Sequence, residues 1–143
     1  QRLGLTPHEV MTVASILERE VNRSEDYPKV ARVIYNRLDA GMPLQMDSTV
    51  AYVTQREGDP WTTAEERETE SAYNTYQNTG LPPGPIGSPG RETIEAALNP
   101  ADGDWLYFVA DFENGGTLFA ETYEDHQANV AKAQEYCRSS DEC

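Results

Sequence analysis

The sequence predicts an α+β fold: a mostly helical single domain with a β-hairpin and short extended segments that line a cleft. Apolar residues recur at helical spacing in several stretches of the chain. Two aromatic and branched stretches, 105–111 and 117–120, flank the turn sequence Asn114-Gly115-Gly116, as in a hairpin. At 143 residues without a visible repeat, residues 1–143 have the length of one domain with its own core.

The first predicted helix has the clearest boundaries. Thr6 and Glu9 have the spacing of a capping box, and Pro7 stands at the first helical position. The residues that follow place one apolar stripe on the helix, and two acids, Glu18 and Glu20, flank this stripe on opposite sides. The stripe consists of Val10, Val13, Ala14, Leu17 and Val21.

A carboxyl group at the edge of an apolar stripe has its pKa raised by desolvation, which a general acid near neutral pH requires. The Glu18 edge also carries Met11 and Ser15, which could border a cleft, whereas Glu20 is followed by Arg23, an expected ion-pair partner. Helical phase does not choose between the two acids, and both could also be solvated surface residues.

Three more helices follow from spacing and from end signals. One is expected over 28–40, ended by Gly41, with Arg37 as an ion-pair partner rather than a substrate contact. A final helix is expected over 122–136. Between them, Ser88-Pro89 is expected to start a helix whose inward face is Ile94, Ala97 and Leu98.

Residues 42–46 form a short extended piece, because Pro43 excludes a helix there, and Asp47 is expected to cap a short third helix. A functional alternative is that Gln45 and Asp47 point to the same side of the extended segment, as sugar-binding groups do. The polar stretch 54–70 is expected to be a surface excursion with one short helix, in which Trp61 packs the excursion down or lies over a sugar ring.

The stretch 71–90 has the most unusual composition. Tyrosines and amides precede a loop, 80–90, in which prolines and glycines alternate. The prolines stiffen this loop and exclude regular structure, which is typical of a segment that walls a binding cleft.

The composition limits the partners and the cofactors. With 25 acidic and 11 basic residues, the net charge of -14 argues against nucleic acid and anionic membrane surfaces. Because the two histidines, His8 and His126, do not stand at ligand spacing with a cysteine, no metal and no cofactor are expected, and His126 should be structural. A disulfide between Cys137 and Cys143 would fit an oxidising compartment.

Five blocks of the sequence, taken together and in order, resemble the endolytic murein transglycosylase family, the YceG-like proteins of bacteria. They cover most of the chain and read ASILERE (14–20), VARVIYNRL (30–38), GMPLQMDSTV (41–50), YNTY with GLPPGPI (73–76 and 80–86) and LYFVAD (106–111). Arg19 departs from the family pattern, which often has lysine there, and Met46 and Ser48 stand where threonine and proline are frequent.

The resemblance implies a lytic transglycosylase that cleaves the MurNAc-GlcNAc β-1,4 bond of nascent glycan strands and leaves 1,6-anhydroMurNAc ends. It implies Glu18 as the catalytic acid, which would also take up the proton of the attacking C6 hydroxyl. The cleft would need polar groups for acetamido and hydroxyl contacts, and the candidates are Gln45, Asp47, Tyr73, Asn74 and Tyr76.

By the same resemblance, the chain is the catalytic domain of a longer protein, without its membrane anchor and LysM-like subdomain. No apolar run in it is long enough to cross a bilayer, and no signal-peptide pattern precedes Gln1. The expected location is the extracytoplasmic face of the bacterial cytoplasmic membrane. The expected partners are peptidoglycan glycan strands and cell-wall synthases.

Two alternatives stay open. A lysozyme-like muramidase would hydrolyse the same bond with water, using Asp47 or Glu70 as a second carboxylate. A glycan-binding or assembly module would bind strands without cleaving them. The chemical nature of the products separates these possibilities.

Overall fold

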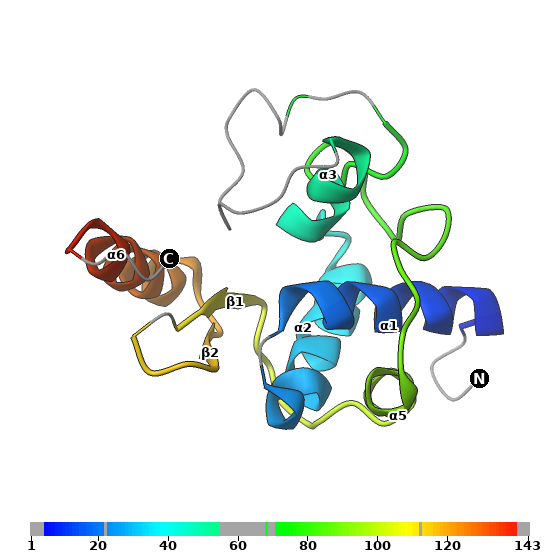
Figure 1. The fold of residues 1–143 in the computed structure, drawn as a ribbon, viewed down its shortest axis with the longest axis horizontal. Helices are drawn as coiled ribbons and strands as arrows, with labels where there is room; N and C mark the ends of the chain where they lie inside the picture. Colours follow the sequence, from blue (N-terminus) through cyan, green and yellow to red (C-terminus); the bar gives the residue numbers. More distant parts are fainter. Residues whose placement is uncertain (1–4, 22, 55–67, 69–70, 112, 140–143) are drawn as a thin grey trace.

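The computed structural model describes residues 5–21, 23–54, 68, 71–111 and 113–139. These residues form five α-helices, one short 3-10 turn and a two-stranded antiparallel sheet, which confirms a mostly helical α+β fold. In chain order, and with the labels of Figure 1, the elements are α1 (Pro7–Glu20), η1 (Ser24–Asp26), α2 (Tyr27–Ala40), α3 (Asp47–Thr54), α5 (Arg91–Leu98), β1 (Tyr107–Ala110), β2 (Thr117–Ala120) and α6 (Tyr123–Ser139).

Helix α1 is the centre of the fold (Figure 1). It contacts α2, α3 and α5, whereas the hairpin and α6 pack against each other to one side. The core is built mainly from α1, α2 and α5, and side chains of the connecting segments complete it. Its most buried members include Val13, Ile16, Leu17, Val30, Ile34, Leu44, Ile86 and Ala97.

The start of α1 and the end of α2 confirm the predicted end signals. The Thr6 hydroxyl accepts the Glu9 N–H at 3.2 Å, and the Glu9 carboxylate accepts the Thr6 N–H at 2.9 Å, so the capping box is complete. Gly41 ends α2 in the left-handed region, with φ at 71°.

Helix α5 differs from the prediction in its start and in its inward face. It begins at Arg91 with Gly90 as the N-cap, and the Gly90 N–H donates to the Glu18 carboxylate. Its buried residues are Thr93, Ala96 and Ala97. Leu98 lies about 100° further round the helix and is 38% exposed, so its predicted burial was wrong.

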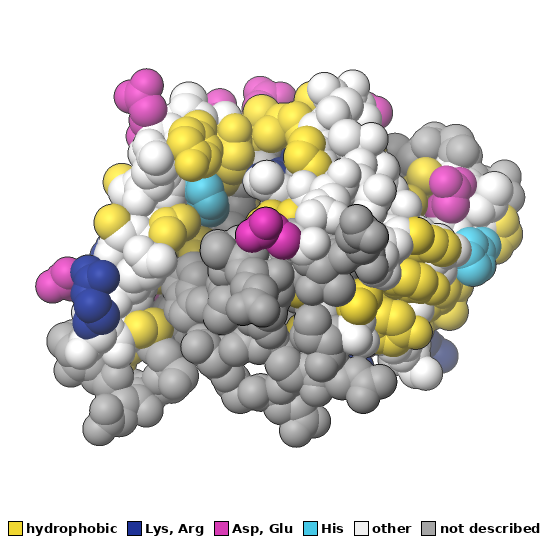
Figure 2. Space-filling view, turned by 90° about the horizontal axis from the view of Figure 1, so that it is seen from above, with side chains coloured by type: hydrophobic (Ala, Val, Ile, Leu, Met, Phe, Trp, Pro, Cys, Tyr) yellow, Lys and Arg dark blue, Asp and Glu magenta, His cyan; other side chains and the backbone are white. Residues whose placement is uncertain are grey.

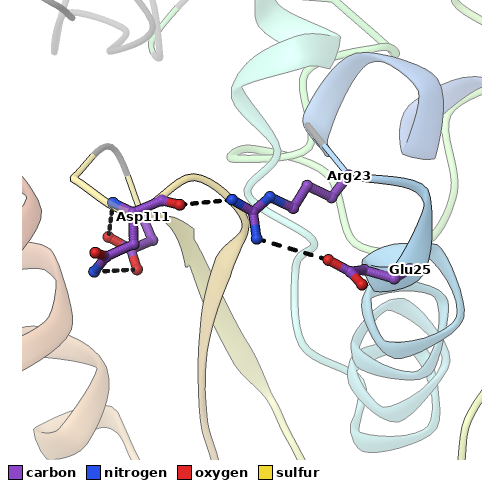
Figure 3. Close-up of polar contacts among 4 residues, drawn as sticks. Arg23, Glu25 and Asp111 are labelled. Atoms are coloured by element: carbon purple, nitrogen blue, oxygen red, sulfur yellow. Dashed lines mark hydrogen bonds and ion pairs between the residues drawn. The ribbon is translucent and has the colours of Figure 1, made fainter.

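The hairpin turn is fixed to the rest of the domain by Arg23. Gly115 and Gly116 adopt φ values of 76° and 83°, which favour glycine. The Arg23 guanidinium donates to the Asn114 carbonyl at 2.6 Å and forms an ion pair with Glu25 at 3.7 Å (Figure 3). A Cβ at Gly115 would lie 2.6 Å from Arg23 Nη2, so a larger residue there would displace the end of the Arg23 side chain.

The first strand is shorter than predicted, since side chains of α2 bind the backbone before it. Asn36 donates to the carbonyls of Gly103 and Trp105 at 3.1 and 2.8 Å. These carbonyls are therefore engaged outside the ladder, and β1 pairs with β2 only from Tyr107 to Ala110. Helix α6 covers the hairpin and extends to Ser139, past the predicted end.

Some predictions fall on residues outside the described part of the chain. These are most of the surface excursion 54–70, including Trp61 and Glu70, and the second cysteine, Cys143. Cys137, in α6, is disulfide-bonded. Within the described ranges, no helix is long and apolar enough to span a bilayer, and no group of three potential metal ligands is present.

Candidate active site

Glu20 ends α1 next to the start of α3. It is partly buried, and its Oε2 accepts the Ser48 N–H at 2.7 Å. Burial raises the pKa of the Glu20 carboxyl above its ordinary value, while the hydroxyl and the N–H of Ser48 act to lower it. The negative charge of Asp47 adds to the upward shift of this pKa. The net effect of these surroundings is a raised pKa of the Glu20 carboxyl, which favours its protonated form.

Asp47, Tyr76 and Glu20 belong to one polar cluster. The short third helix is present as α3, but Asp47 is its first residue rather than its cap, and Asp47 Oδ1 accepts the hydroxyl hydrogen of Tyr76. Both residues are partly buried. The Tyr76 phenol thus fixes the Asp47 carboxylate, whose charge acts on Glu20.

Gln45 lies on the segment that leads into this cluster. Its side chain is exposed, and its backbone is in the left-handed region with φ at 53°. Its N–H donates to the Thr75 carbonyl at 3.1 Å, and the next N–H, of Met46, donates to the Thr75 hydroxyl at 2.8 Å. Non-glycine residues held in this conformation are often found at functional sites.

Tyr73 and Asn74 precede Tyr76 but differ in exposure. Asn74 is only 1% exposed, and its side-chain oxygen accepts the Tyr76 N–H at 2.9 Å, so it fixes the turn that carries Tyr76. Tyr73 is partly buried, and its ring lies 5.1 Å from the ring of Tyr52 on α3. Asn74 is therefore buried, whereas Tyr73 is only partly buried.

Glu18 lies at the other edge of α1 and has different partners. Its Oε1 accepts the Gly90 N–H at 2.8 Å and the Thr93 hydroxyl at 3.1 Å. Gly90 is the N-cap of α5, so Glu18 places an acceptor at the positive end of that helix. Glu18 is exposed, and both of these contacts lie at the start of α5.

The proline-rich loop follows the Glu18 side of α1. The Pro83 carbonyl lies 2.7 Å from His8 Nε2, and the buried Ile86 donates its N–H to the Ser15 hydroxyl at 3.0 Å. The loop therefore covers the α1 edge that carries Ser15 and reaches Glu18 at Gly90. As predicted, it is ordered without being helix or strand.

A separate groove lies between the start of α2 and α5. It has a volume of about 290 Å³ and includes none of the predicted site residues; it is lined by Ser24, Pro28, Glu92, Glu95, Ala96 and Asn99. Figure 2 shows a different face, seen from above in Figure 1, where α3 lies. The described basic side chains are few on this face, which fits the acidic composition.

Sequence reasoning identified Asp47 and Tyr76, but it did not place Glu20 beside them. The contacts that do so are long-range: Glu20 meets Ser48, 28 residues away, and Tyr76 meets Asp47, 29 residues away. Chemically, the cluster offers two carboxyl groups and one phenol, and burial raises the pKa of one of these carboxyl groups, that of Glu20.

Comparisons with known proteins identify the family. The model of the YceG-like family matches residues 1–132. The endolytic murein transglycosylase of Bacillus subtilis strain 168 is 44% identical over 135 residues, which are 94% of this chain and 36% of that protein. The endolytic murein transglycosylase of Streptococcus pneumoniae strain D39 is 41% identical over 133 residues, 90% of this chain and 24% of that protein.

A solved structure agrees with this result. The 2.6 Å crystal structure of a putative yceG-like protein from Listeria monocytogenes matches with a TM-score of 0.83 and 41% identity. The match covers 90% of this chain and 41% of that chain, so the present chain spans less than half the length of the relatives it matches. Family model, relatives and fold agree, and this chain belongs to the YceG-like family.

Proposed function

We propose that this domain is a lytic transglycosylase that cleaves the glycan strands of peptidoglycan internally. The names of its relatives, endolytic murein transglycosylase, support the reaction class. The single observation in the structure that carries the proposal is the partly buried Glu20 carboxyl, whose pKa is raised by burial and by Asp47. An acid of this kind can protonate a glycosidic oxygen near neutral pH.

Glu20, rather than Glu18, is the proposed catalytic acid. Both lie in the block that resembles the family, and the resemblance alone had pointed to Glu18. The contacts of the two side chains favour the other choice, because Glu18 binds the N-terminus of α5 while Glu20 lies beside Asp47 and Ser48. A carboxylate that already accepts two hydrogen bonds from the start of a helix is less available to exchange a proton with a substrate.

In the proposed mechanism, Glu20 gives its proton to the oxygen of the MurNAc-GlcNAc bond, and that bond breaks as positive charge develops on the anomeric carbon. The resulting Glu20 carboxylate then accepts the proton of the muramoyl C6 hydroxyl, whose oxygen closes on the anomeric carbon. The proton count balances, water is not consumed, and the new end is a 1,6-anhydroMurNAc. The charge of Asp47, held by Tyr76, would stabilise the developing cation.

Gln45, which is exposed, and Tyr73, which is partly buried, are proposed to contact the sugars beside Glu20 and Asp47. Asn74 is proposed to act indirectly, by accepting the Tyr76 N–H and so holding Tyr76 in place. As part of a longer protein, the domain is proposed to act outside the cytoplasmic membrane, where murein lies. Membrane anchoring and contact with cell-wall synthases are proposed from the family resemblance alone.

Asp47 also favours a second candidate function. A carboxylate whose charge acts on the acid is what a hydrolytic glycosidase uses as nucleophile or base, so a muramidase with the pair Glu20 and Asp47 is the rival. The two functions cleave the same bond and differ only in the acceptor.

Mass spectrometry of uncrosslinked glycan strands after incubation with the domain tests both. The proposal predicts fragments with anhydro ends, and none in a parallel incubation with Glu20→Gln. Fragments with reducing ends would instead establish the muramidase. Strands that are bound but left uncut by the wild-type domain would overturn both enzymes in favour of a binding module.

A further inference from the structure

Arg37 is a buried cation with no part in the mechanism above. It is 6% exposed, and burial lowers its pKa. Its Nε donates to the Leu106 carbonyl at 2.6 Å, and its Nη1 donates to the carbonyls of Pro43 and Leu44 at 3.0 and 2.9 Å. Its guanidinium carbon lies 5.0 Å from the centre of the Tyr107 ring. In the described part of the chain its partners are thus carbonyls and a ring, not the carboxylate expected from the sequence.

These carbonyls belong to the segment that enters the site. Pro43 and Leu44 are followed by Gln45, whose left-handed backbone persists only if its surroundings hold it. Two sets of contacts do so: Arg37 binds the carbonyls before Gln45, and Thr75 binds the N–H groups of Gln45 and Met46. The direction in which the chain enters α3 depends on both.

Arg37 also faces the tyrosine that holds Asp47. Tyr76 acts to raise the pKa of Arg37, and the phenol of Tyr76 donates its hydrogen to the Asp47 carboxylate. The other ring near the guanidinium, that of Tyr107, stacks against His126 of α6, with 5.0 Å between the ring centres. Arg37 therefore lies between the hairpin side of the domain and the cluster around Asp47.

We propose that Arg37 is a positioning residue for the carboxyl cluster. By fixing the backbone of residues 43 and 44, it keeps Asp47 and the Ser48 N–H beside Glu20. The inference rests on the proposed function of Glu20 and adds a residue that touches neither the substrate nor the acid. Because misplacing a catalytic group by about 1 Å can cost about 100-fold in rate, such a residue matters for kcat.

Arg32 provides a matched control within the same helix. Its Nε donates to the Ala101 carbonyl at 2.6 Å, so it is also an α2 arginine that binds a backbone carbonyl from a partly buried position. Ala101 lies on the connection between α5 and β1, away from residues 43–48 in the chain. Replacing Arg32 removes the same kind of hydrogen bond without loosening the entry to α3.

The experiment compares Arg37→Gln and Arg32→Gln in the whole chain by amide hydrogen exchange and by steady-state cleavage of glycan strands. In Arg37→Gln, exchange of the Ser48 amide should accelerate at least about tenfold. Its kcat should fall about 10- to 100-fold with KM within about threefold. Arg32→Gln should leave Ser48 exchange and kcat within about threefold of wild type.

Equal Ser48 exchange in the two variants, or wild-type kcat in Arg37→Gln, would overturn the inference. If Arg37→Gln does not fold, Arg37→Lys replaces it, since lysine keeps the charge but lacks the fork of donors that reaches several carbonyls. Wild-type Ser48 exchange in Arg37→Lys would then overturn the inference. The exchange data need no turnover, so a chain that cleaves no strands would contradict the proposed function separately.

Discussion

The two edges of α1 carry acids of opposite character, although Glu18 and Glu20 are only two residues apart. On one edge, Glu18 is exposed and accepts two hydrogen bonds from the start of α5. On the other, Glu20 is partly buried against the start of α3, next to the charge of Asp47. The comparison teaches that the hydrogen-bond partners and the burial of each acid depend on the element packed against its edge of α1. The position of the acid within α1 does not determine them.

The largest predicted difference between the two edges is in catalysis. Glu20→Gln removes the transferable proton and should lower kcat by about 100- to 10,000-fold. Glu18→Gln keeps an oxygen that can accept the Gly90 N–H, so its kcat should stay within about threefold of wild type. Rates of anhydro-end release by the two purified variants measure this. Loss of activity in Glu18→Gln alone would reverse the assignment.

A change on the α3 edge should appear in the pH profile. The reaction needs protonated Glu20, so activity is lost as the pH rises through the raised pKa of this group. Asp47→Asn removes a charge that raises this pKa, and the alkaline limb of kcat against pH should move to lower pH. The exposed acid Asp39, changed to Asn, is the control and should leave the limb in place. An unmoved limb in Asp47→Asn would mean that Asp47 does not act on Glu20.

A change on the α5 edge should appear in stability instead. Glu18→Ala leaves the Gly90 N–H and the Thr93 hydroxyl without this acceptor, at an expected cost of about 1 kcal/mol. For a domain of this size the Tm should fall by about 2 to 5 °C. The exposed Glu135, which pairs with Arg138 on α6, provides a comparison, because its removal should cost less than about 0.5 kcal/mol. Equal losses of stability in the two variants would show that Glu18 does not stabilise the start of α5 more than a surface ion pair stabilises α6.

The smallest effect concerns the stability cost of the buried Glu20 carboxyl. A pKa that is higher in the folded state stabilises the fold at pH values below the pKa of the unfolded chain. This contribution is lost as the pH rises through the folded-state pKa. Glu20→Gln should therefore have a higher Tm than wild type at neutral pH, with the difference shrinking or reversing in acid. Thermal melts of both proteins across this range test the sign, and a variant that is less stable at neutral pH would contradict it.

Local signals in the sequence predicted much of the fold. The capping box of Thr6 and Glu9, the Gly41 stop and the Gly115-Gly116 turn depend on nearby residues, and all three are confirmed. Elements whose limits depend on distant partners were predicted less well. The start of α5 lies after the predicted Ser88-Pro89, at Gly90, which Glu18 contacts, and the carbonyls before β1 are bound by Asn36 of α2.

The same distinction applies to the site. The sequence indicated Asp47 and Tyr76 as polar groups of a cleft, and the structure joins them by a hydrogen bond. Helical phase could not choose between Glu18 and Glu20, because both flank the apolar stripe, and the choice of Glu18 rested on the family resemblance alone. The contacts with α3 and α5 that distinguish the two acids are long-range. Arg37 was expected to form an ion pair, since no local pattern reveals that its partners are the carbonyls of Pro43, Leu44 and Leu106.

The central claim, that packing against α3 makes Glu20 the protonated acid, is tested most directly by carbon-13 NMR titration of the side-chain carboxyls. In the wild-type domain, the Glu20 resonance should titrate above the ordinary pKa of about 4.3. In Asp47→Asn it should titrate at a lower pH than in wild type. A Glu20 carboxyl that titrates at or below the ordinary value in the wild-type domain would contradict the account.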